Sequence, residues 1–377
     1  MGATKAAHPN AAESHNPIRV MICDDSLVIR NALARMLESD PMIRVVARVA
    51  NGAAALAEMI AARADVLVLD IEMPVMDGMT ALPQILQADP SLRVIMASTL
   101  TTRGADVAMR ALRLGASDYI PKPAASEIAD ESFRAELLVK VRGQAHLRRR
   151  QMAQQQQAGG RPTALAGLKP AAPGAPHLRP ASRFRPALLA IGSSTGGPQA
   201  LFTLVQGLGR DIPVPVVLTQ HMPSSFIPML AEHLNRLGAM PCGPAEDGQT
   251  LQPGRIHLAP GDHHLCIEPA GGVLRARISN APAENFCRPA VDPMLRSAAA
   301  ATGGRLLIAM LTGMGHDGLA GTRVAIEAGG TAIAQDEATS VVWGMPGAIA
   351  QAGLCHAVLP LPRLAAKIRD LLELRPA

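Results

Sequence analysis

Residues 66–78 read Val-Leu-Val-Leu-Asp-Ile-Glu-Met-Pro-Val-Met-Asp-Gly, and this stretch decides the fold of the first third of the chain. A short apolar run ends in Asp70, and an amphipathic helical pattern follows from residue 78. In an open parallel sheet, ligands bind outside the carboxyl ends of the strands. The stretch therefore predicts a strand over Val66–Asp70, with an acidic residue at the binding edge and a helix behind it.

The same alternation extends in both directions from this stretch. Further strands are expected at Arg19–Cys23, Val45–Val49, Val94–Ala97 and Asp118–Ile120, and helices over about 27–38, 52–62, 78–87, 105–113 and 126–149. Regular alternation of strands and helices predicts a doubly wound parallel sheet with right-handed crossovers.

A second α/β pattern begins after Pro186. Strands are expected at Ala187–Ile191, Val214–Thr219, Ile256–Ala259 and Leu306–Leu311, helices over about 197–208, 224–238, 289–301 and 317–328, and an antiparallel hairpin at the sheet edge near 262–281. At 377 residues the chain is long enough for two domains. We expect a flexible tail over 1–17, a first domain over 18–140, a flexible linker over 141–185 and a second domain over 186–375.

The expected linker carries the basic charge of the chain. Nine Lys and Arg and no Asp or Glu lie between Arg142 and Arg185, so the rest of the chain is net negative although the whole is +5. One Trp, one Tyr and five Phe are too few for a base-stacking platform. We therefore expect a solvated basic linker and no nucleic-acid partner, with transient contact to an acidic partner as the alternative.

The cysteines and the apolar runs bear on location. Five cysteines without metal-ligand or redox spacing fit a reducing compartment. The chain shows neither a secretory signal nor an apolar run of the ~20 residues that span a bilayer. The sequence thus predicts a cytoplasmic protein without membrane insertion.

Acidic residues follow two strands of the first domain. Asp24 and Asp25 come directly after the first strand, and Asp70 ends the third. Three carboxylates at one edge of a sheet suit Mg²⁺, and Lys122 could neutralise a phosphoryl oxygen beside them. Singly, Asp25 could only cap a helix, and Lys122 could be a surface lysine. Pro123 allows a cis bond after Lys122.

With these motifs, residues 18–125 resemble a response-regulator receiver domain. The matching features are Asp24-Asp25, the D-x-x-M-P-x-M-D-G context of Asp70, Ser98 after the fourth strand and Lys122-Pro123 after the fifth. The resemblance implies that Asp70 accepts phosphate from a histidine kinase. It also implies that Asp24, Asp25, Asp70 and the main-chain carbonyl of Glu72 hold Mg²⁺, and that Ser98, Tyr119 and Lys122 form the switch.

The second domain contains a G-x-S-x-G turn at residues 192–196. A tight strand-to-helix turn of this kind presents the hydroxyl of Ser194, although it could instead be a turn without chemistry or a phosphate cradle. Ser193 is the alternative nucleophile. His221 and Asp317 follow other strands, so the three side chains can meet in one crevice as a nucleophile, a base and an orienting acid. The order Ser, His, Asp differs from that of α/β-hydrolases.

Residues 187–360 resemble the catalytic domain of chemotaxis-type protein-glutamate methylesterases, the CheB family. The matching stretches are Ile191–Pro198, Gln220–Pro223, Leu258–Asp262, Gly313–Gly318 and Gln335–Pro346. The resemblance implies that Ser194 is the nucleophile, His221 the base and Asp317 its orienting carboxylate. It makes the Met314 N–H a candidate oxyanion donor, places Thr195 beside the active site, and requires no cofactor for the esterase.

Three departures from the family pattern lie near this set. Ala290 stands where the family usually has a small hydroxyl residue, Pro293-Met294 replaces an aliphatic-aromatic run, and His316 takes a place often held by Asn or Lys. Substrate fit around 286–294 is therefore the least constrained part of the prediction.

The two resemblances together predict an enzyme under phosphorylation control. It would hydrolyse glutamyl methyl esters on methyl-accepting chemoreceptors, releasing methanol, and would deamidate glutamines on the same receptors. The alternatives are a response regulator whose second domain only binds a ligand or partner, and a DNA-binding output, for which the second domain lacks a basic recognition helix.

Overall fold

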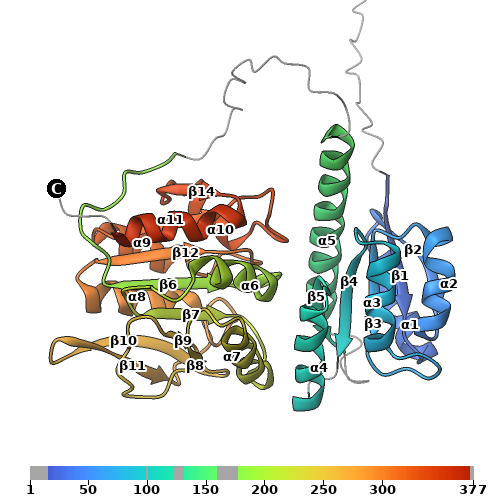
Figure 1. The fold of residues 1–377 in the computed structure, drawn as a ribbon, viewed down its shortest axis with the longest axis horizontal. Coiled ribbons are helices and arrows are strands. Elements are labelled where there is room, and N and C mark those ends of the chain that lie inside the picture. The colour runs from blue at the N-terminus through green and yellow to red at the C-terminus, as the bar shows by residue number, and fades with distance from the viewer. Residues whose placement is uncertain (1–15, 99–100, 123–130, 159–176, 374–377) are drawn as a thin grey trace, which may run out of the picture.

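The computed structural model describes residues 16–98, 101–122, 131–158 and 177–373, which form two α/β domains side by side (Figure 1). Pro123, residues 1–15 of the expected tail and residues 159–176 of the expected linker lie outside the described residues.

The N-terminal domain is a five-stranded parallel sheet in the order β2-β1-β3-β4-β5. Its strands are β1 (Ile18–Cys23), β2 (Ile43–Val49), β3 (Val66–Asp70), β4 (Arg93–Ser98) and β5 (Asp118–Pro121), and its helices are α1 (Leu27–Glu38), α2 (Gly52–Ala62), α3 (Gly78–Ala88), α4 (Thr102–Arg113) and α5 (Glu131–Ala158). Helices α1 and α5 pack on one face and α2, α3 and α4 on the other. Alternation of strands and helices predicted this doubly wound sheet, and the prediction is confirmed.

The C-terminal domain is a seven-stranded parallel sheet in the order β14-β13-β12-β6-β7-β9-β8. Its strands are β6 (Leu188–Ser193), β7 (Val216–Gln220), β8 (Cys242–Pro244), β9 (Ile256–Leu258), β12 (Leu306–Met310), β13 (Thr331–Gln335) and β14 (Ala357–Leu359). The helices are α6 (Gly197–Leu208), η1 (Ser224–Phe226), α7 (Ile227–Arg236), α8 (Val291–Thr302), α9 (Leu319–Glu327), α10 (Met345–Gln351) and α11 (Leu361–Glu373).

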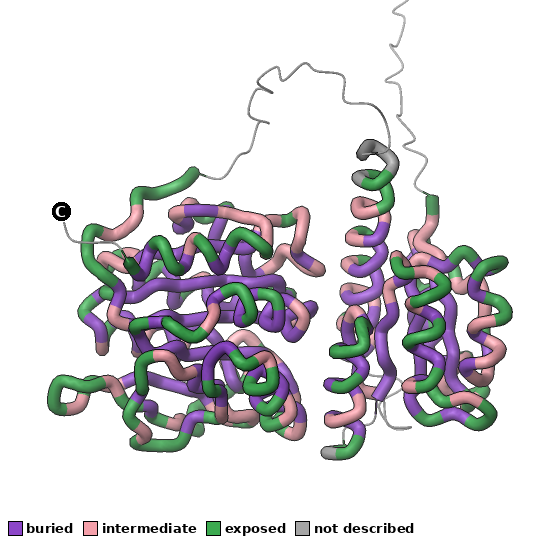
Figure 2. Tube along the Cα trace, in the orientation of Figure 1, coloured by how far each residue is buried: buried purple, intermediate pink, exposed green. Residues whose placement is uncertain are grey.

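Successive residues of the central strands face opposite sides of this sheet. Leu189 and Ile191 of β6 pack with α6, α7 and α11, whereas Leu188 and Ala190 pack with α8 and α10. The buried residues accordingly run along both sheets, and the outer faces of the helices are exposed (Figure 2). A sheet covered on both faces leaves its strand ends as the place for a ligand.

The expected hairpin is confirmed as an antiparallel pair, β10 (His264–Ala270) with β11 (Val273–Ser279). The hairpin forms a separate two-stranded sheet, and its buried residues pack in the same hydrophobic core as those of α8.

Helix α5 is longer than expected. The sequence predicted a helix to about residue 149, overlapping the start of the expected linker, but α5 continues to Ala158, so residues 141–158 of the expected linker are helical. Val141 and Ala145 are buried in the core of the N-terminal domain, and Arg148 bonds to the carbonyl of Ala64 at 2.5 Å and to Asp89 at 2.8 Å. Gln is a good helix former, and the run has neither Gly nor Pro between Gln144 and Ala158.

The two domains meet where α4 and β5 contact η1, α7 and the start of α6, and where Gly143 of α5 lies against Val341 (Figure 1). The Tyr119 ring stacks on Phe226 with 4.6 Å between centroids. Gln199 Nε2 donates to the carbonyls of Leu112 and Ala116 at 2.7 and 2.6 Å. Leu112 lies in the last turn of α4 and Ala116 in the segment that leads into β5, so the side-chain amide of Gln199 ties both to the start of α6.

In the part of the chain that the structure describes, no helix is long and apolar enough to cross a membrane.

Candidate active site and phosphorylation site

The turn after β6 presents Ser194 at a cavity. Gly196 has φ 74°, a left-handed conformation that favours glycine, and it lets the chain turn directly into α6. Ser194 is half-buried and lines a cavity of about 540 Å³. Ser193, the alternative nucleophile, is fully buried and donates to Gln220 Oε1 at 2.7 Å. Between the two serines, the geometry therefore favours Ser194.

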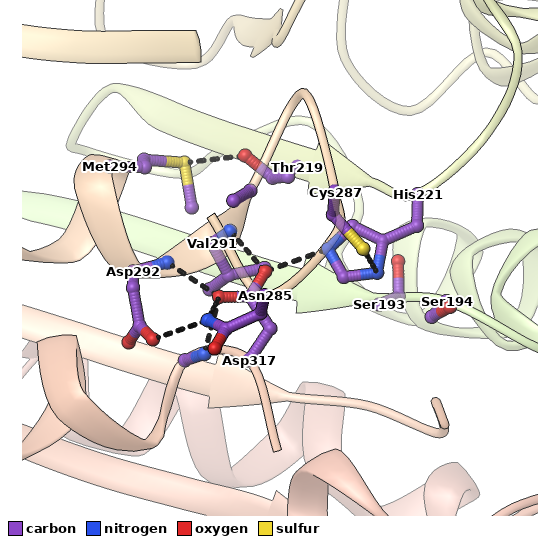
Figure 3. Close-up of polar contacts among 12 residues, drawn as sticks. Ser193, Ser194, Thr219, His221, Asn285, Cys287, Val291, Asp292, Met294 and Asp317 are labelled. Carbon is purple, nitrogen blue, oxygen red and sulfur yellow. Dashed lines mark hydrogen bonds and ion pairs between the residues drawn. The ribbon is translucent and has the colours of Figure 1, made fainter. Parts of the chain in front are cut away.

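His221 and Asp317 lie together at the same cavity. His221 Nε2 is 2.8 Å from Asp317 Oδ2 (Figure 3). Burial lowers the pKa of His221, but hydrogen bonds with Asp317 and Cys287 outweigh it and raise the pKa to about 9. Burial alone would raise the pKa of Asp317, but the imidazole of His221 and the backbone N–H groups outweigh it and lower this pKa to about 2. The pair is thus arranged to stabilise an imidazolium.

Asp317 is fixed by the start of α8. Its Oδ2 accepts from the N–H of Val291 at 2.6 Å, and its Oδ1 from the N–H of Asp292 at 3.1 Å and from Gly318 at 2.9 Å. Asn285 Nδ2 adds a fourth donor at 2.9 Å. A carboxylate at a helix N-terminus is stabilised by these N–H groups and by the helix dipole, so the acid is held ionised and oriented.

The second ring nitrogen of His221 contacts a cysteine. Its Nδ1 lies 3.5 Å from Cys287 Sγ, and within the described residues no hydrogen bond joins Ser194 Oγ to the ring. Catalytic hydrogen bonds are often long in the absence of substrate and tighten in the complex. For Ser194 to act as a nucleophile with His221, its hydroxyl would have to replace Cys287 at this nitrogen.

The loop after β12 brings Met314 next to Ser194. The Ser194 N–H donates to the carbonyl of Thr312 at 3.0 Å. A Cβ on Gly313 would lie 2.9 Å from Cβ of Ser194, so only glycine allows this close approach. Met314 lines the cavity and is 41 % exposed, while Thr195, buried, adjoins Ser194.

The departures from the family pattern at Ala290 and Pro293 have one structural reason. Ala290 is the N-cap of α8 and makes no side-chain capping bond. An N-cap hydroxyl accepts from the second or third N–H of the helix. Here the second, that of Asp292, already donates to Asp317, and the third residue is Pro293, which has none. A hydroxyl at 290 would find no donor, so alanine suits this helix. His316 lines the cavity.

The cavity is shared by the two domains. Asp118, Tyr119 and Lys140 of the N-terminal domain line it together with the residues described above. Asp118 Oδ2 accepts from the N–H of Gly196 at 3.2 Å, within the serine turn itself. Burial raises the pKa of Asp118, and Lys140, 3.8 Å away, opposes the rise.

The acidic residues of the N-terminal domain also meet, at the carboxyl end of its sheet. Asp24, Asp25 and Asp70 each offer a carboxylate oxygen, and these oxygens lie within 4.8 Å of one another. Lys122 Nζ is 2.6 Å from Asp70 Oδ2 and 3.0 Å from Asp24 Oδ2. Burial raises the pKa of Asp70 to about 6, against the lowering effect of Lys122. Clustered hard oxygen donors fit a divalent cation such as Mg²⁺.

The predicted switch residues Ser98, Tyr119 and Lys122 lie in or directly after strands β4 and β5. Ser98, at the end of β4, donates to the carbonyl of Gly104 at 2.8 Å. Tyr119 of β5 faces the other domain through Phe226. Glu72 is exposed, and its N–H donates to Asp70 Oδ1 at 3.3 Å; the role of its carbonyl stays a prediction.

Three residues of the candidate active site were not singled out from the sequence. Asn285 bonds Asp317, Cys287 contacts His221, and Gln220 Nε2 donates to the carbonyl of Ser194 at 2.9 Å. The signal available for Gln220 was its place beside His221. Asn285 and Cys287 lie in a loop without periodicity, which offered no signal.

An acid pocket on one sheet and a Ser-His-Asp cavity on another define a response regulator with a hydrolase-type output domain. Residues 189–368 match the family model of the CheB methylesterase, and residues 20–131 match that of the response regulator receiver domain. The chain belongs to the CheB methylesterase family, as the sequence motifs predicted.

Similar proteins cover nearly the whole chain. A protein-glutamate methylesterase/protein-glutamine glutaminase 1 of Paramagnetospirillum magneticum is 50% identical over 94% of this chain and 96% of its own. Its counterpart in Azospirillum brasilense is 49% identical over 97% of this chain and 95% of its own. A group 2 operon protein of the same name from Rhodospirillum centenum is 46% identical over 100% and 99%.

Proposed function

We propose that this protein is a protein-glutamate methylesterase and protein-glutamine glutaminase that acts on methyl-accepting chemoreceptors under phosphorylation control. The observation that carries the proposal is that Ser194 and the His221–Asp317 pair line one cavity. The family and the names of its relatives support the same activity.

Ester hydrolysis follows from this arrangement in two steps. Ser194 Oγ attacks the glutamyl carbonyl carbon while His221 takes the hydroxyl proton, and Asp317 stabilises the imidazolium. The imidazolium then gives its proton to the departing methoxy group, so methanol leaves and an acyl-enzyme remains. Water, deprotonated by His221, attacks this ester, releases glutamate and restores Ser194. With a glutamine side chain the leaving group is ammonia.

The oxyanion formed in both steps needs donors. We assign this role to the backbone N–H of Met314, whose loop packs directly on Ser194. One such donor contributes on the order of 3 kcal/mol to the barrier. This chemistry uses the side chains and backbone of the domain and no metal.

We assign the phosphorylation site to Asp70. Its carboxylate would accept a phosphoryl group from a histidine kinase, with Mg²⁺ held by Asp24, Asp25, Asp70 and the carbonyl of Glu72. Mg²⁺ supplies charge neutralisation for phosphoryl transfer when bound. The modification adds about −1.5 to −2 charge. Lys122, which bridges Asp24 and Asp70, would then pair with the phosphoryl oxygens.

The interface supplies a route for control. In the unphosphorylated protein β5 and α4 lie against the serine turn, through Asp118 and Gln199. Ser98 and Tyr119 would rearrange on phosphorylation, and the Tyr119–Phe226 stack would loosen. The receiver would then uncover the cavity for a receptor. The proposed division is a receiver over 18–140, a linker over 141–185 and a catalytic domain over 186–375, with residues 141–158 continuing the receiver's last helix.

Methanol release from methylated receptor membranes tests the enzyme proposal. Ser194→Ala is expected to abolish release, whereas Ser193→Ala, one residue away and facing Gln220, should retain most of it in protein that stays folded. Undiminished release by Ser194→Ala would favour the rival function, a response regulator whose second domain only binds.

A further inference from the structure

An exposed aromatic ring stands at the rim of the catalytic cavity. Phe286 is fully exposed, with a relative accessibility of 105 %, and lines the same cavity as Ser194, His221 and Met314. Neither the chemistry of the ester nor the docking of the two domains uses this ring.

The backbone around Phe286 is a two-residue hairpin turn. Glu284 and Cys287 exchange backbone hydrogen bonds of 3.1 and 2.9 Å, and the two central residues have φ 54° (Asn285) and 63° (Phe286). Turns with positive φ at both central residues strongly prefer Asn followed by Gly. Asn285 fits this rule, whereas an aromatic residue in the left-handed region is a strained choice.

The turn is anchored from both sides, which fixes the backbone that carries the ring at the cavity rim. Asn285 Nδ2 donates to Asp292 and Asp317 at 2.9 Å each. Glu284 forms a two-pronged ion pair with Arg296, with both N–O distances 2.6 Å. Cys287, on the far side of the turn, contacts the imidazole of His221. The same turn therefore orients the catalytic acid, touches the catalytic base and holds Phe286 outward.

We propose that Phe286 is a substrate-anchoring residue that packs on the receptor helix carrying the target glutamyl ester. The inference rests on the proposed function. A glutamyl side chain can enter the cavity only if its helix lies across the rim. Side chains three and four positions from the target lie on the same helix face, about 5–6 Å away. Phe286 stands at that rim, and the exposed side chain of Met314 lines the same cavity.

The position of Phe286 indicates which molecule would bind over it. The rim belongs to the cavity that contains the nucleophile, so whatever covers Phe286 must present an acyl group to Ser194. Since the ring stays exposed while the receiver is docked, it is available to a receptor in either state of the switch. A rigid, strained aromatic side chain beside a reactive centre is typical of an energetic anchor in an interface.

Steady-state kinetics with methylated receptor in membrane vesicles test this role. Phe286→Gly removes the ring and relieves the turn. It should raise KM on the order of tenfold with kcat little changed, while thermal stability is kept or increased. Phe286→Tyr should behave as the wild type. Phe184→Ala removes another exposed ring, far from the cavity in the sequence, and should leave KM unchanged.

Hydrolysis of the small ester p-nitrophenyl acetate separates anchoring from structural damage. It should be equal in the wild type and Phe286→Gly. An unchanged KM for receptor in Phe286→Gly overturns the proposal, and so does a parallel loss on the small ester. Co-sedimentation with receptor vesicles needs no turnover. If the wild type sediments but releases no methanol, the proposed esterase fails while weaker sedimentation of Phe286→Gly still supports the anchor; equal sedimentation of the two overturns it.

Discussion

Removing the side-chain amide of Gln199 tests whether the receiver restrains the catalytic domain. Gln199 lies on α6, the helix that begins just after the serine turn, and its Nε2 donates to two carbonyls of the receiver, those of Leu112 and Ala116. Gln199→Ala deletes both bonds and leaves the catalytic residues in place. In the undocked protein these carbonyls can bond water instead. Losing the two bonds therefore destabilises the docked state and not the undocked state.

The expected size follows from these two bonds. Each is a neutral hydrogen bond with a net contribution of about 0.5–1.5 kcal/mol. The free energy of docking between the two domains should therefore become less favourable by about 1–3 kcal/mol, which lowers the docking equilibrium constant roughly 5- to 150-fold. Methanol release by the unphosphorylated protein should rise by a factor in this range, up to the rate of the phosphorylated protein.

The assay compares Gln199→Ala with Thr203→Ala, each with and without a phosphodonor. Thr203 is exposed on the same helix and donates to the carbonyl of Gln199, so its loss should leave the basal rate unchanged. Phosphorylated rates should be equal for all three proteins. A basal rate of Gln199→Ala within twofold of the wild type would refute restraint by this interface.

Three further predictions concern the base, the helix behind the acid, and the receiver. The esterase rate should rise from pH 7 to pH 9, because His221 is a base only when neutral and its pKa is raised to about 9. The contribution of the His221–Asp317 pair to the free energy of unfolding is full below about pH 6.5 and is lost as pH rises through 9. An esterase rate that is flat from pH 7 to pH 9 contradicts the assignment of His221 as the base. Ala290→Ser alone should lower the free energy of unfolding by about 1–3 kcal/mol, because position 290 is fully buried and the new hydroxyl finds no donor, whereas in a Pro293→Val background, which restores an N–H, this loss should be smaller by about 1 kcal/mol; equal losses in both backgrounds in urea unfolding would show that Pro293 is not the cause. Val75 is exposed with φ 68°, so Val75→Gly should stabilise the receiver by about 1 kcal/mol, seen as a higher urea midpoint, and a lower midpoint would mean that the turn is not strained.

Periodicity predicted the strands that carry the sites because each is a buried run ended by a polar residue. The strand over Val66–Asp70 has the predicted bounds, and those ending near Ser193 and Gln220 shifted by at most two residues. Strands β8 and β14, of three residues each, have too few positions to show a period and were not predicted, whereas β9, equally short, was; the five-residue strand β13 was also missed. Helix α11 was missed as well, although it packs beside α6 in the same core.

At the active site, the sequence predicted the residues that follow strands but not those that lie in a loop. Ser194, His221 and Asp317 each follow a strand, so topology alone brings them to one edge. Asn285 and Cys287 reach the same place from a loop, through contacts across 32 and 66 positions of the chain. Their roles depend on the path of a tight turn, which the sequence does not specify.

The central claim is that phosphorylation at Asp70 controls hydrolysis at Ser194. It is tested most directly by methanol release from methylated receptor membranes by the full chain, with Mg²⁺, with and without a small phosphodonor such as acetyl phosphate. The phosphodonor should raise the rate severalfold in the wild type and leave Asp70→Asn unchanged. Equal wild-type rates in the two conditions, or the same increase in Asp70→Asn, would contradict the account.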